Sequence, residues 1–348
     1  MEFGWHRPRR VSLFEDGADQ SVDPYRIRPS SLLALGVYLS VVLVAAWAAP
    51  QLMANRITLV VLGHDLAFGG GHGHHYGLRL LLVLVVPTIF LIELTMVGWR
   101  DSSLWRLVRR TPSSMTDAVC FLVGQTPVMD VVSFVATLGL VLVSAQWLQA
   151  ALRQWTGYNP SLAGAPFAGQ LLIYFLVFSF IDYWTHRLDH SRWFWPLHRY
   201  HHAADDFCIF SAVRVHPAAF TGVIPELLPA VLVGASPEVL TAVSIFVVTH
   251  RYVIHSRMNA NFGWVGRYML QSPTHHRLHH SAEKERIGGH YSLVPLWDHL
   301  FGTWRGEADQ SLPIGVDTAY RQGMWLIPDW WRDYCEFWSG LSLLGRKQ

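Results

Sequence analysis

Long apolar runs are the feature that most constrains the fold of this 348-residue chain. About 20 apolar residues suffice for a helix to cross a bilayer, and inside lipid a helix satisfies its own backbone hydrogen bonds. A further apolar region, 218–255, is interrupted by Pro225, Pro229 and Pro237 and is typical of a helical hairpin. We therefore predict an all-α integral membrane protein with a hairpin and about four transmembrane helices, near residues 32–50, 78–98, 129–150 and 170–185.

The composition agrees with a membrane protein. Hydrophobic residues make up 51% of the chain and charged residues 15%, whereas about one quarter of a soluble domain is charged. The net charge of +2 gives no reason to expect a nucleic-acid partner. The three cysteines are widely spaced and form no C-x-x-C pair, which argues against a disulfide framework and against a thiolate zinc site. Any metal would therefore be held by nitrogen or oxygen.

Arginine residues predict the orientation of the spans. Segments 1–30 and 99–128 contain nine arginines, whereas segments 51–77 and 151–169 contain two. Because cytoplasmic loops are enriched in Lys and Arg, we expect both chain ends in the cytoplasm and the fourth span to reach it near residue 186. The first apolar run is too long for a cleavable signal peptide and lacks a clear small-residue cleavage site, so we expect a retained span.

Histidine motifs fill the region that follows the fourth span. Of the 19 histidines, 14 lie between His186 and His299. The stretch "DYWTHRLDH" places two histidines at i and i+4, and H-x-x-H-H occurs twice, as "HRYHH" at 198–202 and "HRLHH" at 276–280. Residues three or four apart share one helix face, so the imidazoles of each motif can converge on a metal ion. A histidine patch without a catalytic metal is the alternative, but the repeated pattern favours the metal.

Eight histidines in these motifs exceed what one ion can hold. A structural zinc takes four protein ligands and a catalytic zinc takes three, so the motifs predict two metal ions. Soluble di-iron bundles use E-x-x-H pairs, and none is present here. The site would therefore consist of imidazoles alone, which suit iron, zinc, copper and nickel.

The order of these motifs resembles the membrane-bound fatty acid hydroxylase and sterol desaturase superfamily. The resemblance covers residues 182–304 and includes Asp182 of "DYWTHR", "RVHP" at 214–217, "SPTHHRLHH" at 272–280 and "WDHLFGTW" at 297–304. It implies a dinuclear iron centre at the cytoplasmic face, in an enzyme that uses O2 and two electrons to hydroxylate or desaturate a lipid such as a fatty acyl chain or a sterol. The metal ligands that it implies are His186, His190, His198, His201, His202, His276, His279 and His280.

The resemblance also implies a ninth ligand between the second and third histidine motifs. The stretch "THRYVIHS" offers His250 and His255. We predict His255, because the family places this histidine shortly before a polar turn that leads to the third motif, and His250 remains the alternative. Carboxylates commonly orient metal-bound imidazoles through the second ring nitrogen, and we expect Asp182 to play this catalytic positioning role.

Three regions follow from these patterns. We expect residues 1–128 to form an N-terminal membrane region with two transmembrane helices and cytoplasmic arginine-rich segments. Residues 129–305 would form the histidine-motif domain, and residues 306–348 a C-terminal amphipathic cap, part of it at the membrane interface. Residues 1–128 have no counterpart in the family pattern, and its usual H-P-L-E is replaced by "HPAAF".

The electron donor and the exact reaction stay open. No heme-binding cytochrome b5 module is visible, so the resemblance implies a separate donor, either a ferredoxin or a cytochrome b5-type protein with its reductase. Hydroxylation, desaturation and ether cleavage would all use such a site. The rival classes are a non-catalytic scaffold with a metal-stabilised cap and a metal transporter, whose ligands we would expect midway through the spans.

Overall fold

The computed structural model describes residues 57–61, 64–68, 74–137, 164–283, 289–306 and 312–342, with most of 150–162 and residues 36 and 40. The regular secondary structure of these residues is almost entirely helical, as expected. The departure among them is an antiparallel hairpin of β1 (Ile57–Val61) and β2 (His64–Phe68), in a segment predicted to be a loop. The β-branched residues of "ITLVV" explain the strand, because such side chains fit a pleated backbone well.

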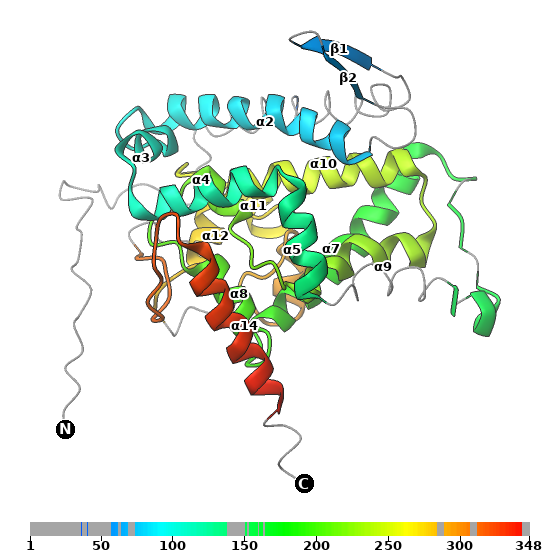
Figure 1. Ribbon diagram of the computed structural model, residues 1–348. Coiled ribbons are helices and arrows are strands. Elements are labelled where there is room, and N and C mark those ends of the chain that lie inside the picture. Colours follow the sequence, from blue (N-terminus) through cyan, green and yellow to red (C-terminus); the bar gives the residue numbers. More distant parts are fainter. Residues whose placement is uncertain are drawn as a thin grey trace.

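Three long helices form the centre of the fold. Helix α10 (Pro237–Ile254) contacts both α2 (His74–Val97) and α7 (Phe167–Asp189) and lies between them (Figure 1). The main apolar core lies between these helices and includes Ile89, Phe178 and Val243, one residue from each helix. This core holds the C-terminal ends of α7 and α10 next to each other.

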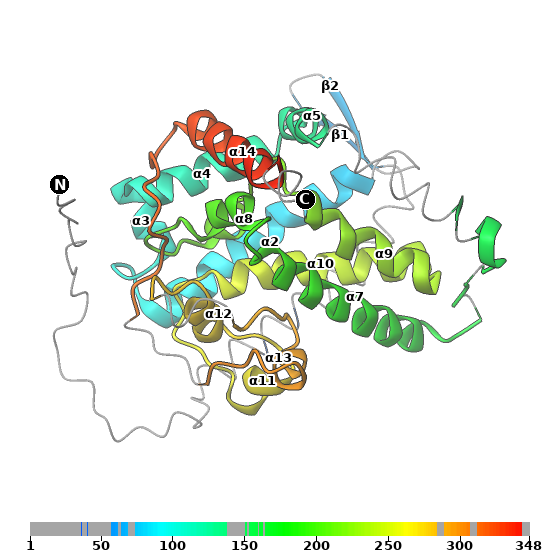
Figure 2. The same cartoon turned by 90° about the horizontal axis from the view of Figure 1, so that it is seen from below.

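The predicted hairpin region contains α9 (Val223–Val233) and α10, preceded by the 3-10 turn η2 (Phe220–Gly222). Gly234 ends α9 with a φ of 59°, a conformation that side chains disfavour, and a Cβ there would collide with the Pro160 carbonyl oxygen. Helix α9 packs against α7, so α7, α9 and α10 lie side by side (Figure 2).

One described helix, α7, is long and apolar enough to cross a membrane. In α2 the apolar stretch is shorter, Val85–Val97. Almost all of the predicted span at 32–50 lies outside the described residues, as do residues 138–149 of the predicted span at 129–150, which begins within α5 (Pro127–Ala136). The number of four spans therefore stays a prediction.

Shorter elements gather around the ends of α7 and α10 that carry the histidines (Figures 1 and 2). They are α3 (Ser103–Arg109), α4 (Pro112–Gly124), α8 (Trp195–His202), η1 (Ile209–Val213), α11 (Gly263–Tyr268), α12 (Pro273–His279), α13 (Leu296–Leu300) and α14 (Leu326–Ser342).

A buried ion cluster fastens α14 to α8. The Arg199 guanidinium donates to the carboxylates of Asp333 and Glu336 on α14, and its Nε donates to the Tyr320 hydroxyl at 3.1 Å. Asp333 is fully buried, so its charge depends on these donors and on Arg332. Arg199 lies within the "HRYHH" motif of α8, which carries three of the predicted ligands. Helix α14 therefore holds these ligands in place through Arg199.

Candidate metal centre

The nine histidines predicted as metal ligands lie in two adjacent groups. In each group, one ligand atom from every histidine lies within 4.8 Å of those of the other members. We call them group A, which contains His186, His190, His198, His202 and His279, and group B, which contains His201, His255, His276 and His280.

The two H-x-x-H-H motifs contribute to these groups in a complementary way. In α8 the middle histidine, His201, belongs to group B and the outer two belong to group A. In α12 the middle histidine, His279, belongs to group A and the outer two belong to group B. Residues i and i+4 are separated by only about 40° around a helix, whereas i+3 lies on the other side of residue i. One H-x-x-H-H helix can therefore serve two neighbouring sites.

Local sequence explains where the third motif begins. Ser272 precedes α12 in an extended conformation, and its hydroxyl accepts a hydrogen bond from the His275 backbone N–H at 3.2 Å. Pro273 follows at the first helical position, where a missing N–H costs nothing. This start places the three motif histidines at the buried C-terminal end of a short helix.

Backbone carbonyls fix the ring tautomer of three histidines. Nδ1 lies 2.7 Å from the Tyr291 oxygen in His186, 2.7 Å from the Arg251 oxygen in His255 and 2.8 Å from the Gly289 oxygen in His279. A carbonyl oxygen only accepts, so each Nδ1 donates a proton and each Nε2 presents a lone pair. This is the tautomer that a metal-binding imidazole requires.

The contacts within group B fit a metal ion. The His255 Nε2 lies 2.9 Å from the His276 Nε2 and 3.2 Å from the His201 Nε2, and the His276 Nε2 lies 3.1 Å from the His280 Nε2. The single Nε2 lone pair of His255 would have to accept two hydrogen bonds. Nitrogens bound to one ion at about 2.1 Å and at right angles lie about 3.0 Å apart. A shared cation accounts for these contacts better than hydrogen bonds do.

Burial keeps the imidazoles in the metal-binding state. Burial, followed by the neighbouring imidazoles, holds the pKa of His201, His276 and His280 well below the ordinary value of 6.5. The same causes act on His202 and His279 in group A. Burial lowers the pKa of His255 to about 3. These rings are therefore neutral at neutral pH, and no proton has to be displaced before a metal binds.

Asp298 supports the loop beside the histidine groups, a position that the sequence motifs did not single out. Its buried carboxylate accepts hydrogen bonds from the backbone N–H groups of Tyr291 and Ser292, at 2.9 and 3.0 Å, and from the Thr303 hydroxyl at 2.7 Å. Burial raises the pKa of Asp298 to about 6. The chain segment that it holds supplies the carbonyls of Gly289 and Tyr291 to two histidines. The "WDHLFGTW" motif thus reaches the centre through this loop.

The structure places Asp182, the expected positioning carboxylate, against an arginine. Asp182 pairs with Arg251 at 3.4 Å, while the Nδ1 of His186 contacts the Tyr291 carbonyl instead. Asp189 has an oxygen 3.9 Å from the Nδ1 of His198, and its other oxygen accepts from the Thr221 hydroxyl. Asp189 is therefore the carboxylate near a predicted ligand ring, at a distance longer than a hydrogen bond. The signal in the sequence was its place directly before His190 in "RLDH".

The alternative ninth ligand, His250, lies outside both groups. Its ring stacks on Phe246 at 5.9 Å between ring centroids, which favours His255 as the ninth ligand. Three further histidines surround Trp304 instead, with ring centroids 4.4 to 4.9 Å from the indole, and they are His275, His290 and His299.

Comparison with known proteins identifies the region that contains these histidines. Residues 171–303 match the model of the fatty acid hydroxylase family. The chain is 29% identical over 139 residues to human alkylglycerol monooxygenase, which covers 39% of this chain and 31% of that protein. The zebrafish (Danio rerio) alkylglycerol monooxygenase is 26% identical over 174 residues, 46% of this chain and 37% of that protein. The matched region thus spans about a third of these relatives.

A second kind of relative is matched over more of its length. Methylsterol monooxygenase 1-3 of Arabidopsis thaliana is 24% identical over 240 residues, which is 67% of this chain and 78% of that protein. No solved structure matches the chain. The family model and both kinds of relative agree with the resemblance carried by the histidine motifs. The match over residues 171–303 and these relatives support the fatty acid hydroxylase and sterol desaturase superfamily.

Proposed function

We propose that the protein is a membrane oxidoreductase that holds two iron ions with the nine histidines of groups A and B. The observation that carries this proposal is the division of nine buried or half-buried histidines into two adjacent groups with converging ligand atoms. The names of its relatives, alkylglycerol monooxygenase and methylsterol monooxygenase, support oxygen chemistry on a lipid. The substrate would be a fatty acyl, sterol or similar hydrophobic molecule.

Iron held by imidazoles with open coordination positions supplies the activation of O2 that attack on an unactivated C–H bond needs. In a hydroxylation, one oxygen atom enters the C–H bond and the other leaves as water, with two electrons and two protons from the donor. The residues of this chain orient three of the imidazoles through the carbonyls of Gly289, Tyr291 and Arg251. Burial of the rings excludes bulk water from the centre.

A cavity of about 180 Å³ adjoins both groups and offers a place for the lipid. Its walls include the rings of His186 and His198 from group A and of His255 and His276 from group B. Much of the remaining wall is apolar. A carbon chain in this cavity would lie directly against the histidines, as an oxygenase requires.

The membrane placement belongs to the same proposal. Helix α7 is apolar enough to span a bilayer, and both of its metal-motif histidines lie at its C-terminal end. With both chain ends and the centre on the cytoplasmic side, a soluble ferredoxin or a cytochrome b5-type donor with its reductase can deliver electrons. A reporter fused after Gln348 should be active in the cytoplasm, and activity only on the opposite side would contradict this topology.

Metal analysis and oxygen uptake test the function. Purified full-length protein is expected to hold about two metal ions per chain, in line with the ligand count. Reconstituted with iron and a reductase, it should consume O2 and reductant when lipid is added. One ion or none in active protein would contradict the dinuclear centre, whereas zinc bound during expression would not. Bound iron without lipid-dependent O2 uptake would favour the scaffold instead.

A further inference from the structure

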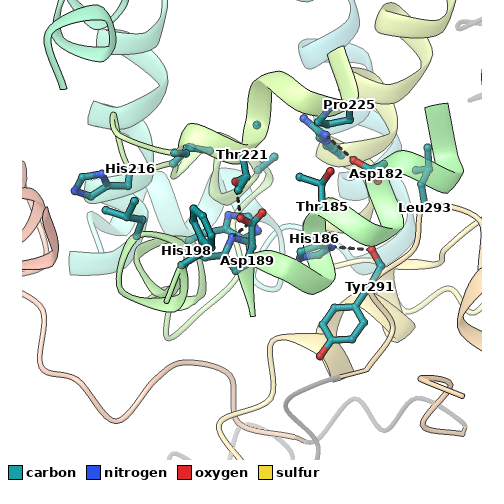
Figure 3. Close-up of a pocket in the computed structure, with 18 of the residues that line it drawn as sticks. Asp182, Thr185, His186, Asp189, His198, His216, Thr221, Pro225, Tyr291 and Leu293 are labelled. Atoms are coloured by element: carbon teal, nitrogen blue, oxygen red, sulfur yellow. Dashed lines mark hydrogen bonds and ion pairs between the residues drawn. The ribbon is translucent and has the colours of Figure 1, made fainter. Parts of the chain in front are cut away.

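The cavity beside the histidines has charged groups at one end. Figure 3 shows Asp182, Pro225 and Leu293 at this end, His216 at the other, and His186, Asp189 and His198 between them. Asp182 pairs with Arg251 across the cavity wall at 3.4 Å. Asp182 is mostly buried, while the Arg251 side chain is 45% exposed. A ligand with a polar end would meet this pair.

The charge of the wall disfavours an anionic ligand. Arg251 is the one Arg or Lys among the described residues that line the cavity, and it already has a carboxylate partner. A fatty acid carboxylate or a phosphate would face the Asp182 carboxylate and would have to compete with it for Arg251. A hydroxyl meets neither cost, because it donates to Asp182 and accepts from Arg251.

The position of the Asp182–Arg251 pair limits which carbon atom of a bound lipid can react. Asp182 and His186 are four residues apart on α7, so their Cβ atoms lie about 5–6 Å apart. A hydroxyl bound at Asp182 is therefore close to group A. The reacting carbon would lie within about four or five bonds of the hydroxyl carbon, given this separation. The rest of the molecule would extend along the apolar walls near Phe194, Phe220 and Ile254.

We infer that the cavity selects uncharged lipids with a hydroxyl group, binds that hydroxyl between Asp182 and Arg251, and presents a carbon near it to the histidine groups. This inference rests on the proposed function and narrows its substrate class. It excludes free fatty acids and phospholipid headgroups as the group bound at this end of the cavity.

Binding of two chain-matched lipids tests the selection without any turnover. Radiolabelled 1-hexadecanol and hexadecanoate are titrated at pH 7.5 against the full-length, metal-loaded protein in lipid nanodiscs. The alcohol is expected to bind at least about tenfold more tightly, because the wall opposes the carboxylate. Equal affinities, or tighter binding of hexadecanoate, would overturn the inference.

Variants of the ion pair sharpen the same measurement. Asp182→Asn leaves Arg251 without its carboxylate partner, so the ratio of alcohol to carboxylate affinity should fall at least about tenfold. Arg251→Gln should weaken the binding of the alcohol, and the binding of hexadecanoate should remain weak. Asp205→Asn removes an exposed carboxylate outside the cavity and should keep the original ratio. An unchanged ratio in Asp182→Asn would contradict the assignment even if Arg251→Gln failed to fold.

Product mapping separates this inference from the proposed function. Iron-loaded protein with O2 and a reductase is given 1-hexadecanol, and mass spectrometry locates the new oxygen atom or double bond. Oxidation within about five carbons of the hydroxyl agrees with the position of Asp182. Oxidation in the middle of the chain would overturn the inference and leave the function intact. A preserved alcohol preference without oxidation of any lipid would overturn the function alone.

Discussion

Groups A and B use the same residue but are held in different ways. Group A has five histidines, and the Gly289 and Tyr291 carbonyls orient two of its rings from outside. Group B has four histidines, and three of them have a buried Nδ1 with no partner among the described residues, His201, His276 and His280. Group A thus has a ligand to spare and group B depends on the packing of α8, α10 and α12. We therefore expect group B to be more sensitive than group A to the loss of one histidine.

The largest expected effect is loss of a group B ligand. His276→Ala leaves three histidines in group B, and we expect the protein to lose about one metal ion. Activity should fall by more than about 100-fold, because the loss of a residue that only supports a metal ligand already costs about 10- to 100-fold. In contrast, His190→Ala leaves four histidines in group A and should retain both ions with a smaller loss. Elemental analysis and initial rates of lipid oxidation measure both. Equal metal loss in the two variants would contradict the expected difference between groups A and B.

The ninth ligand gives an effect of similar size. His255→Ala should remove metal from group B, because the His255 Nε2 faces two other members of the group. His250→Ala is the matched control, since it changes the same helix segment but lies outside both groups. It should keep both ions. Full iron and activity in His255→Ala, with loss of both in His250→Ala, would reverse the assignment.

An intermediate effect is expected for the carboxylate that supports group A. Asp189→Asn keeps the size of the side chain but removes the carboxyl group that lies 3.9 Å from the Nδ1 of His198. We expect a loss of about 10- to 100-fold in metal affinity or activity, as is usual for partners of metal-bound imidazoles. Asp182→Asn should leave metal affinity unchanged, because Asp182 pairs with Arg251. Competition with a chelator compares the two variants, and weaker metal binding in Asp182→Asn alone would restore our first expectation.

The pH dependence of the metal-free protein tests the buried rings as a whole. The pKa of His255 is lowered to about 3, and burial lowers that of His275 and His290 to about 4 and about 3. Between these values and 6.5 the unfolded chain binds more protons than the native protein, so the free energy of unfolding falls as the pH drops. The midpoint of thermal unfolding should be lower at pH 5.5 than at pH 7.5. Burial raises the pKa of Asp117 and Asp298 to about 6 and that of Asp189 to about 7, and these three groups act in the opposite direction. A higher midpoint at pH 5.5 would mean that they dominate.

The smallest effect is expected outside both groups. His299 stacks on Trp304 at 4.4 Å, and its Nε2 lies 3.1 Å from the Arg267 carbonyl oxygen. His299→Ala should keep both metal ions and lower the free energy of unfolding by about 1 kcal/mol, the usual size of such a ring pair. Denaturant unfolding and elemental analysis check this. Loss of metal would show that the Trp304 cluster supports the centre more directly.

The convergence of the nine histidines could be predicted from the sequence because helical spacing is local. The i, i+3 and i+4 positions of "HRYHH" and "HRLHH" determine a shared face wherever the helix lies. The division into groups A and B was not predictable, because it depends on how α8 and α12 face each other across the core. The roles of Asp189 and Asp298 were missed for the same reason, since their partners Thr221 and Tyr291 come from other elements. The helical class could be predicted from the apolar runs, which do not reveal a short strand pair such as β1 and β2.

The complementary use of α8 and α12 has a consequence for how the centre is assembled. Each helix contributes ligands to both groups, so an ion that orders the helices for one group also prepares the other. The second ion would then meet a preorganised site and bind more tightly than it would to an empty protein, which is positive cooperativity. Under limiting metal, the population should divide into chains with no ions and chains with two, and native mass spectrometry of half-loaded protein should show few singly loaded molecules.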